Sequence, residues 1–71
     1  MDMTTKQYDA LEQAVSDGRR VVVYRRGTEY VVVPRRFRAH GGREALDATH
    51  PTTGDRITFY VDEMDGFEVV R

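Results

Sequence analysis

The chain has 71 residues, no cysteine and a formal net charge of −1 at pH 7, which indicates one small domain without disulfide bonds or thiolate zinc sites. A domain of this size buries only about 60 % of the surface of its unfolded chain, which excludes a deep enclosed pocket. No apolar run approaches the roughly 18 residues of a membrane span and no signal-peptide pattern is present, so we expect a cytoplasmic location.

The first predicted element is an amphipathic helix over residues 5–17. Thr4 and Gln7 have the spacing of a capping box, which satisfies backbone N–H groups at the start of a helix. Gly18 supplies the left-handed C-cap that ends it. Between these signals, apolar residues recur at helical spacing, with small ones between them: Tyr8, Ala10, Leu11, Ala14 and Val15.

Two strands are predicted next, over residues 19–26 and 29–34. The β-branched and aromatic run Val21–Tyr24 suits pleated structure. Gly27-Thr28 fits a two-residue hairpin turn with glycine first. This turn predicts a register that pairs Tyr24 with Val31, Val23 with Val32, Val22 with Val33 and Arg26 with Glu29.

Pro34 has no N–H to donate to a ladder, so we expect the second strand to end there. The glycine pair Gly41-Gly42 then marks a turn. Three further strands are predicted, over residues 44–49, 56–61 and 67–70. One helix followed by five short strands indicates an α+β, mainly β domain, in which the antiparallel strands form a small barrel or half-barrel without exposed edges.

Residues spread over most of the chain resemble the WYL domain, a Sm-like or SH3-like β-barrel found mostly in bacterial transcriptional regulators. The matching residues are, in order, Val21-Val22-Val23-Tyr24, Gly27, Val32-Val33-Pro34, Phe37, Leu46, Ala48, Gly54 and Phe59-Tyr60-Val61-Asp62-Glu63-Met64. The resemblance implies an SH3/Sm-like barrel in a compact, stand-alone form, in a bacterial or phage regulator. It also implies that the DNA-binding and dimerisation segments usual in the family are missing here.

The chain departs from this family at the positions that contact ligands. Where the family has its tryptophan-tyrosine-leucine triplet, this sequence reads Glu44-Ala45-Leu46, and the arginines of the family's fourth strand fall on Tyr60 and Glu63. Those aromatic and basic groups are the family's contacts to nucleotides or nucleic acid. The resemblance therefore supports the fold more than it supports ligand sensing.

Charge is distributed unevenly along the chain. Residues 18–43 hold eight arginines against one acid, Glu29, whereas both flanking segments are acidic. Such a block attracts phosphate or an acidic protein, or else it pairs with acidic strands across a sheet. The near-zero net charge favours pairing, with Asp62, Glu63, Asp65 and Glu68 as the neutralising groups. The candidate binding residues are Arg35, Arg36, Arg38, Arg43 and Tyr60, which we expect on one rim.

The aromatic residues divide into two groups. We expect Tyr8, Phe37, Phe59 and Phe67 to form the core, because so small a domain needs its large apolar side chains for packing. Tyr24, Tyr30 and Tyr60 would either interleave with arginines as a stacking platform for bases or be half-buried with their hydroxyls in water.

No pattern of catalytic or metal-binding residues is present. His40 and His50 fall in predicted loops without a carboxylate pattern to orient them, and Ser16 has no base partner. In the acidic turn Asp62–Gly66, Met64 occupies a position where a calcium loop needs an oxygen ligand, and no distal glutamate follows. We therefore expect no enzyme, no catalytic residue, no metal and no cofactor.

The function expected from these observations is that of a non-enzymatic regulatory module that binds a protein partner. The alternative is a WYL-like domain that binds a nucleotide or single-stranded nucleic acid. The two differ in salt dependence, because only binding to nucleic acid predicts a steep loss of affinity with salt.

Overall fold

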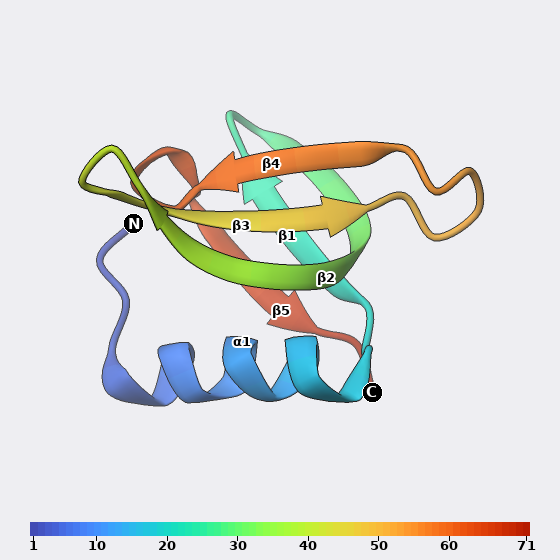
Figure 1. Cartoon of the computed structure of the whole chain (residues 1–71), viewed down its shortest axis with the longest axis horizontal. Helices are drawn as coiled ribbons and strands as arrows, with labels where there is room; N and C mark the ends of the chain where they lie inside the picture. Colours follow the sequence, from blue (N-terminus) through green and yellow to red (C-terminus); the bar gives the residue numbers. More distant parts are fainter.

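The computed structural model describes residues 1–71, apart from the side chain of His40. One α-helix is followed by five antiparallel strands and a short 3-10 helix: α1 (Thr5–Asp17), β1 (Val21–Arg25), β2 (Thr28–His40), β3 (Arg43–Thr49), β4 (Arg56–Tyr60), η1 (Val61–Glu63) and β5 (Gly66–Val69). The strand order is β4-β3-β2-β1-β5. This confirms the predicted fold class, and the curled sheet with α1 packed beneath it forms an open half-barrel (Figure 1).

Local signals determine α1. The Thr4 hydroxyl accepts a hydrogen bond from the Gln7 N–H at 3.2 Å, and the Thr4 N–H donates to Gln7 Oε1 at 2.8 Å, so the predicted capping box is present. Gly18 ends the helix with φ 67°. Leu11 and Ala14 are buried against the sheet, whereas Ala10 is exposed. Within the described chain, no helix combines the length and apolar character needed to cross a membrane.

β2 corrects one expectation. The strand does not end at Pro34 but continues to His40. Residues 35–40, which lie between the predicted end of the strand and the Gly41-Gly42 turn, therefore belong to β2. Proline is tolerated here because pairing with β1 ends at Val32 and because the register with β3 shifts between Pro34 and Arg36. Such a β-bulge is a common place for proline within a sheet.

The hairpin register was also predicted wrongly. The turn residues are Arg26 and Gly27, with φ of 51° and 74°, and Arg25 pairs with Thr28. Two positive φ values define the type I′ turn, whose twist matches that of the flanking strands. As a result Tyr24 lies opposite Glu29, and the observed pairs are Val21 with Val32, Val22 with Val31 and Val23 with Tyr30.

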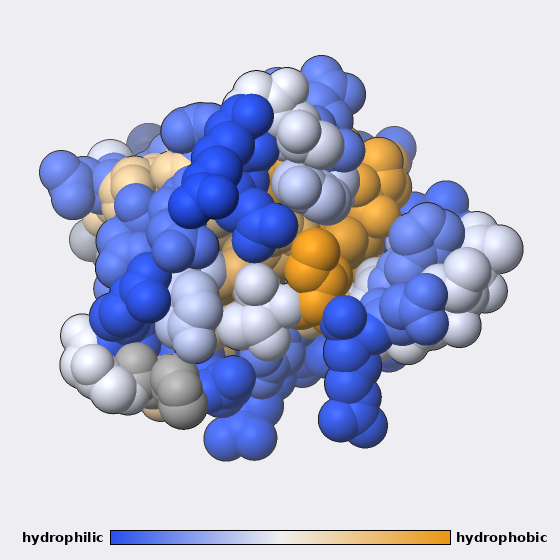
Figure 2. All heavy atoms as spheres, turned by 90° about the horizontal axis from the view of Figure 1, so that it is seen from above, coloured by the Kyte–Doolittle hydropathy of each residue, from blue (hydrophilic) through white to orange (hydrophobic). Residues whose placement is uncertain are grey.

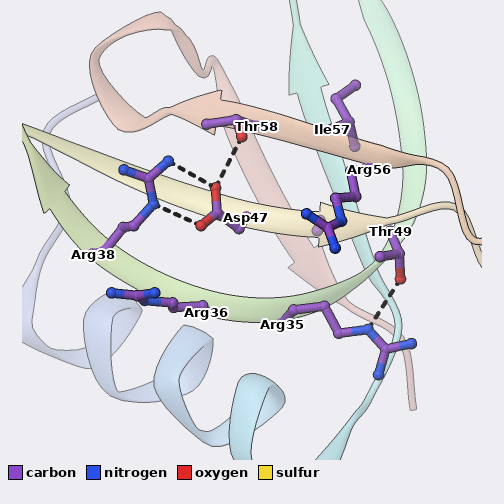
Figure 3. A pocket seen from close by; sticks show the side chains of 9 residues that line it. Arg35, Arg36, Arg38, Asp47, Thr49, Arg56, Ile57 and Thr58 are labelled. Carbon is purple, nitrogen blue, oxygen red and sulfur yellow. Dashed lines mark hydrogen bonds and ion pairs between the residues drawn. The ribbon is translucent and has the colours of Figure 1, made fainter.

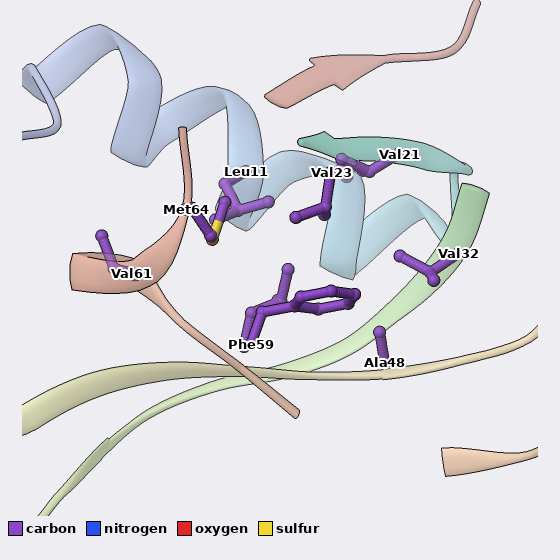
Figure 4. Close-up of a cluster of buried hydrophobic side chains, with 10 residues drawn as sticks. Leu11, Val21, Val23, Val32, Ala48, Phe59, Val61 and Met64 are labelled. Carbon is purple, nitrogen blue, oxygen red and sulfur yellow. The ribbon is translucent and has the colours of Figure 1, made fainter. Parts of the chain in front are cut away.

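The core lies between α1 and the inner face of the sheet, with Phe59 at its centre (Figure 4). Phe59 has no exposed surface, and the Tyr30 ring meets it edge-on with the centroids 5.3 Å apart. Phe37 and Phe67 are half-buried against this cluster. The Tyr8 ring packs edge-on against Phe37. The aromatic residues predicted as core therefore all contribute to packing, but only Phe59 is fully enclosed.

Candidate functional site

The outer face of β2, β3 and β4 gathers arginines from two strands. Arg36 pairs with Asp47 and Asp47 pairs with Thr58, so these three side chains point to the same side of the sheet. Alternation places Arg38 on that side too, and Arg56, which pairs with Thr49, lies at its edge. We call this surface the arginine face and define it by Arg35, Arg36, Arg38 and Arg56.

Arg35 joins this face because of the bulge. Strict alternation would point Arg35 and Arg36 to opposite sides of the sheet. The register shift between Pro34 and Arg36 makes Arg35 the extra residue, and bulges re-aim side chains in this way. Arg35 Nε donates to Thr49 Oγ1 at 3.0 Å, which holds its guanidinium beside the outer side of β3 (Figure 3).

Asp47 is the acid on the arginine face. Arg38 donates two hydrogen bonds to the Asp47 carboxylate, from Nε to Oδ2 at 2.6 Å and from Nη2 to Oδ1 at 3.1 Å. The Thr58 hydroxyl donates to the same carboxylate at 2.9 Å. The hydrogen bonds from Arg38, the single hydrogen bond from Thr58 and the nearby charges of Arg38 and Arg36 lower the pKa of Asp47. Asp47 is thus held ionised and neutralises one of the arginines.

The remaining guanidinium groups border an open pocket of about 530 Å³. Its lining residues are Arg35, Arg36, Arg38, Asp47, Ala48, Thr49, Arg56, Ile57 and Thr58. Figure 3 shows the Arg56 side chain lying across β3, between Asp47 and Thr49. Among the described residues, the exposed side chains of Arg36 and Arg56 have no hydrogen-bond or ion-pair partner. Arginine in this state is suited to binding carboxylate or phosphate groups, because it offers planar, multiple donors.

Arg43 and Tyr60 lie outside this pocket. Arg43 donates to both oxygens of Asp62, at 2.8 and 2.6 Å, and to Glu63 at 3.2 Å. Its guanidinium also lies 3.9 Å from the centroid of the Tyr60 ring. The Arg43 hydrogen bond is the main cause of the lowered pKa of Asp62. The structure thus brings together three of the five predicted site residues and places the other two in a separate cluster.

The expected pairing of charges across the sheet holds for part of the basic block. Asp47 pairs with Arg38, and the acidic turn pairs with Arg43. Among the described residues, no carboxylate forms an ion pair with Arg35, Arg36 or Arg56. Ion pairs thus neutralise Arg38 and Arg43 across strands and Arg19 beside Asp17, whereas Arg35 and Arg36 remain charged at the pocket.

Sequence analysis did not identify Arg56 or Asp47 as part of the site. Arg56 belongs to the acidic C-terminal third of the chain, so its contribution is hidden in a count of charges along the sequence. The usable signal was the alternation from Arg56 to Tyr60, which puts Arg56 and Thr58 on the side opposite Ile57 and Phe59.

The tyrosines do not form one stacking platform. Tyr30 packs against Phe59 in the core, and Tyr60 lies beneath Arg43. The pKa of Tyr24 is raised by partial burial and by its acidic neighbours Glu68 and Glu29. Each tyrosine is thus engaged in a different place.

The two histidines differ in position. His50 lies in the loop between β3 and β4, where its Nδ1 accepts hydrogen bonds from the backbone N–H groups of Thr52 and Thr53 at 3.1 and 3.2 Å. His40 lies at the end of β2 rather than in a loop. Among the described side chains, no group of three or more histidine and acidic residues is placed to hold a metal ion.

Comparisons of this chain with protein families, with curated proteins and with solved structures find no match. The resemblance to the WYL domain therefore stays a prediction that rests on the residues quoted above.

Proposed function

We propose that this chain is a small, non-enzymatic binding module that recognises an acidic segment of a protein partner through the arginine face. The observation that carries the proposal is the grouping of four arginines from two strands around one open pocket that contains a single carboxylate. Carboxylate groups match the forked donor geometry of arginine. The WYL resemblance supports a regulatory role for such a module.

An acidic protein segment suits this face better than nucleic acid. Binding of single strands relies on bases stacking on aromatic rings, and no aromatic residue lines the described pocket. The neighbouring Tyr60 ring is covered by Arg43.

The chemistry of Asp47 supports binding rather than catalysis. A general base works best when its pKa lies near the operating pH. The pKa of Asp47 is lowered by Arg38 and Thr58, so at neutral pH this carboxylate has little tendency to take a proton. Its role in the proposal is to orient Arg38 and to set the charge of the face.

Binding of an acetylated hexaglutamate peptide, followed by calorimetry, tests the proposal. The double substitution Arg36→Gln with Arg56→Gln removes two unpaired guanidinium groups, and we expect a loss of affinity of about tenfold or more. The matched control is Arg20→Gln with Arg26→Gln, which removes the same charge from exposed positions outside the face. Equal affinity of the two double variants would overturn the proposal.

An oligothymidine probe serves as the second arm of this experiment. If the oligonucleotide binds more tightly than the peptide, with an affinity that falls steeply between 50 and 200 mM salt, the WYL-like alternative replaces the protein partner. Weak binding of the oligonucleotide, lost equally in both double variants, supports the acidic peptide as the ligand class.

A further inference from the structure

Thr49 lies between two arginines on the outer face of the sheet. Arg56 of β4 pairs with Thr49, and its side chain lies across β3 between Asp47 and Thr49 (Figure 3). Arg35 reaches Thr49 from β2, where its Nε donates to Thr49 Oγ1 at 3.0 Å. Arg35, Thr49 and Arg56 all line the pocket of the arginine face. We call these three residues the Thr49 subsite.

The positive charge of the Thr49 subsite is not compensated by the rest of the pocket. Asp47 is the one carboxylate among the lining residues, and it is bound by Arg38. Like charges on neighbouring strands repel each other, and arginine cannot relieve this repulsion by losing its proton. A bound anion between Arg35 and Arg56 would therefore stabilise the arrangement.

The acidic residues closest to Arg56 in a second pocket do not neutralise the subsite either. Arg56 also borders an apolar groove, together with Glu29 and Asp55. Apolar surface is open on one face of the molecule, with hydrophilic side chains around it (Figure 2). Among the described residues, neither acid lines the pocket of the arginine face or forms an ion pair with Arg56. The subsite keeps both positive charges.

The hydrogen-bond donors of the subsite suit a phosphate group. Thr49 Oγ1 accepts from Arg35, and no described group accepts the proton of this hydroxyl, so the hydroxyl can donate to a ligand. Arg35 retains both Nη groups and Arg56 its whole guanidinium. A phosphate monoester offers three acceptor oxygens and a charge of about −1.5 to −2 at pH 7, whereas a carboxylate offers two oxygens and a single charge. The phosphate therefore matches the donors and the charge of the subsite more fully.

We propose that the Thr49 subsite binds the phosphate of a phosphorylated serine or threonine in the acidic partner segment. The proposal rests on the proposed function and specifies its ligand. Arg36 pairs with Asp47, two residues from Thr49 along β3, and two residues of a strand span about 7 Å. An acidic residue close in sequence to the phosphorylated one can therefore reach Arg36 while the phosphate lies beside Thr49. Phosphorylation of the partner would then increase its affinity for the arginine face.

A protein segment uses more of this pocket than other sources of phosphate do. A free phosphate ion would occupy the Thr49 subsite alone and leave Arg36 without a partner. A nucleotide would bring a base, and no aromatic residue lines the described pocket to stack against it. A phosphorylated acidic segment has groups for both the subsite and Arg36.

The test compares the capped peptide Glu-Glu-phosphoserine-Glu-Glu with capped hexaglutamate by calorimetry at about pH 8, where the phosphate is doubly ionised and the two peptides have equal formal charge. We expect the phosphopeptide to bind about tenfold more tightly. Arg35→Gln and Thr49→Val should each reduce this preference to about twofold or less. The matched control Arg36→Gln removes the same charge from the same pocket and should weaken both peptides by similar factors. Arg35 is exposed, so Arg35→Gln tests the subsite even if Thr49→Val lowers the stability.

Three results would overturn the phosphate subsite. Equal affinity for the phosphopeptide and hexaglutamate, both still lost on substitution of Arg36 and Arg56, leaves the proposed function intact and removes this inference. Inorganic phosphate that binds as tightly as the phosphopeptide would show a general anion site that does not recognise a protein segment. Tighter binding of a 5′-phosphorylated oligothymidine than of the phosphopeptide would assign the subsite to nucleic acid.

Discussion

At the scale of single residues, Asp47 sets the strength of the arginine face. Its carboxylate occupies two donors of Arg38, and an anionic ligand has to compete for them. Asp47→Asn keeps the shape of the side chain and removes its charge. We expect the affinity for hexaglutamate, measured by calorimetry, to rise about fivefold to tenfold as Arg38 becomes available. The control Asp62→Asn removes the same charge from an arginine-bound carboxylate outside the pocket, so equal gains from both variants would contradict this role.

The same variant has a second measurable consequence in acid. Because the pKa of Asp47 is lowered from its ordinary value of 3.8, its contribution to stability is complete above that value and is lost as the pH falls through the lowered pKa. We expect urea unfolding of Asp47→Asn to lose less free energy between neutral pH and pH 2 than the parent does. Parallel pH profiles for the two proteins would show that the ion pair does not stabilise the fold.

The sequence alone was enough to predict Arg35, Arg36 and Arg38 as binding residues, because three arginines occur within four positions. Their grouping with Arg56 depends on the registers between β2, β3 and β4. Those registers cannot be read from local sequence, since a shift of one residue exchanges the two faces of a strand. The bulge at Arg35 adds such a shift within one strand.

At the scale of elements, a substitution in the hairpin between β1 and β2 should change the stability in opposite directions for the observed turn and for the predicted turn. In the observed turn Arg26 has φ 51°, a conformation that asparagine adopts at lower cost than arginine, and Asn-Gly is the preferred pair of a type I′ turn. Arg26→Asn should therefore raise the free energy of unfolding by about 1 kcal/mol. If the turn were Gly27-Thr28, position 26 would lie in a strand and asparagine there would destabilise. Thermal melting of the variant distinguishes the two turns.

The elements differ in how well the sequence predicted them, and the difference follows from the range of the interactions. α1 begins and ends as predicted because the capping box at Thr4 and the left-handed Gly18 act within a few residues. β2 was cut short at Pro34 because its continuation depends on pairing with β3 and on the bulge, which are contacts between distant parts of the chain.

At the scale of the whole molecule, one thin core supports the arginine face. The arginine face lies on strands whose inner residues pack around Phe59. Folded domains have about 0.05–0.15 kcal/mol of stability per residue, so a chain of 71 residues is expected to have roughly 4–11 kcal/mol in total. A single large cavity in the core would remove much of this free energy of unfolding.

Phe59→Ala provides that test of the fold. Removing a fully buried phenylalanine ring typically costs about 3–5 kcal/mol, and here the ring also loses its edge contact with Tyr30. We expect a large drop in the melting temperature, a substantial unfolded fraction at 37 °C and loss of hexaglutamate binding in proportion to that fraction. Val70→Ala, at an exposed position, should change the stability by less than about 0.5 kcal/mol. A Phe59→Ala protein that melts like Val70→Ala would show that the half-barrel does not pack around this ring.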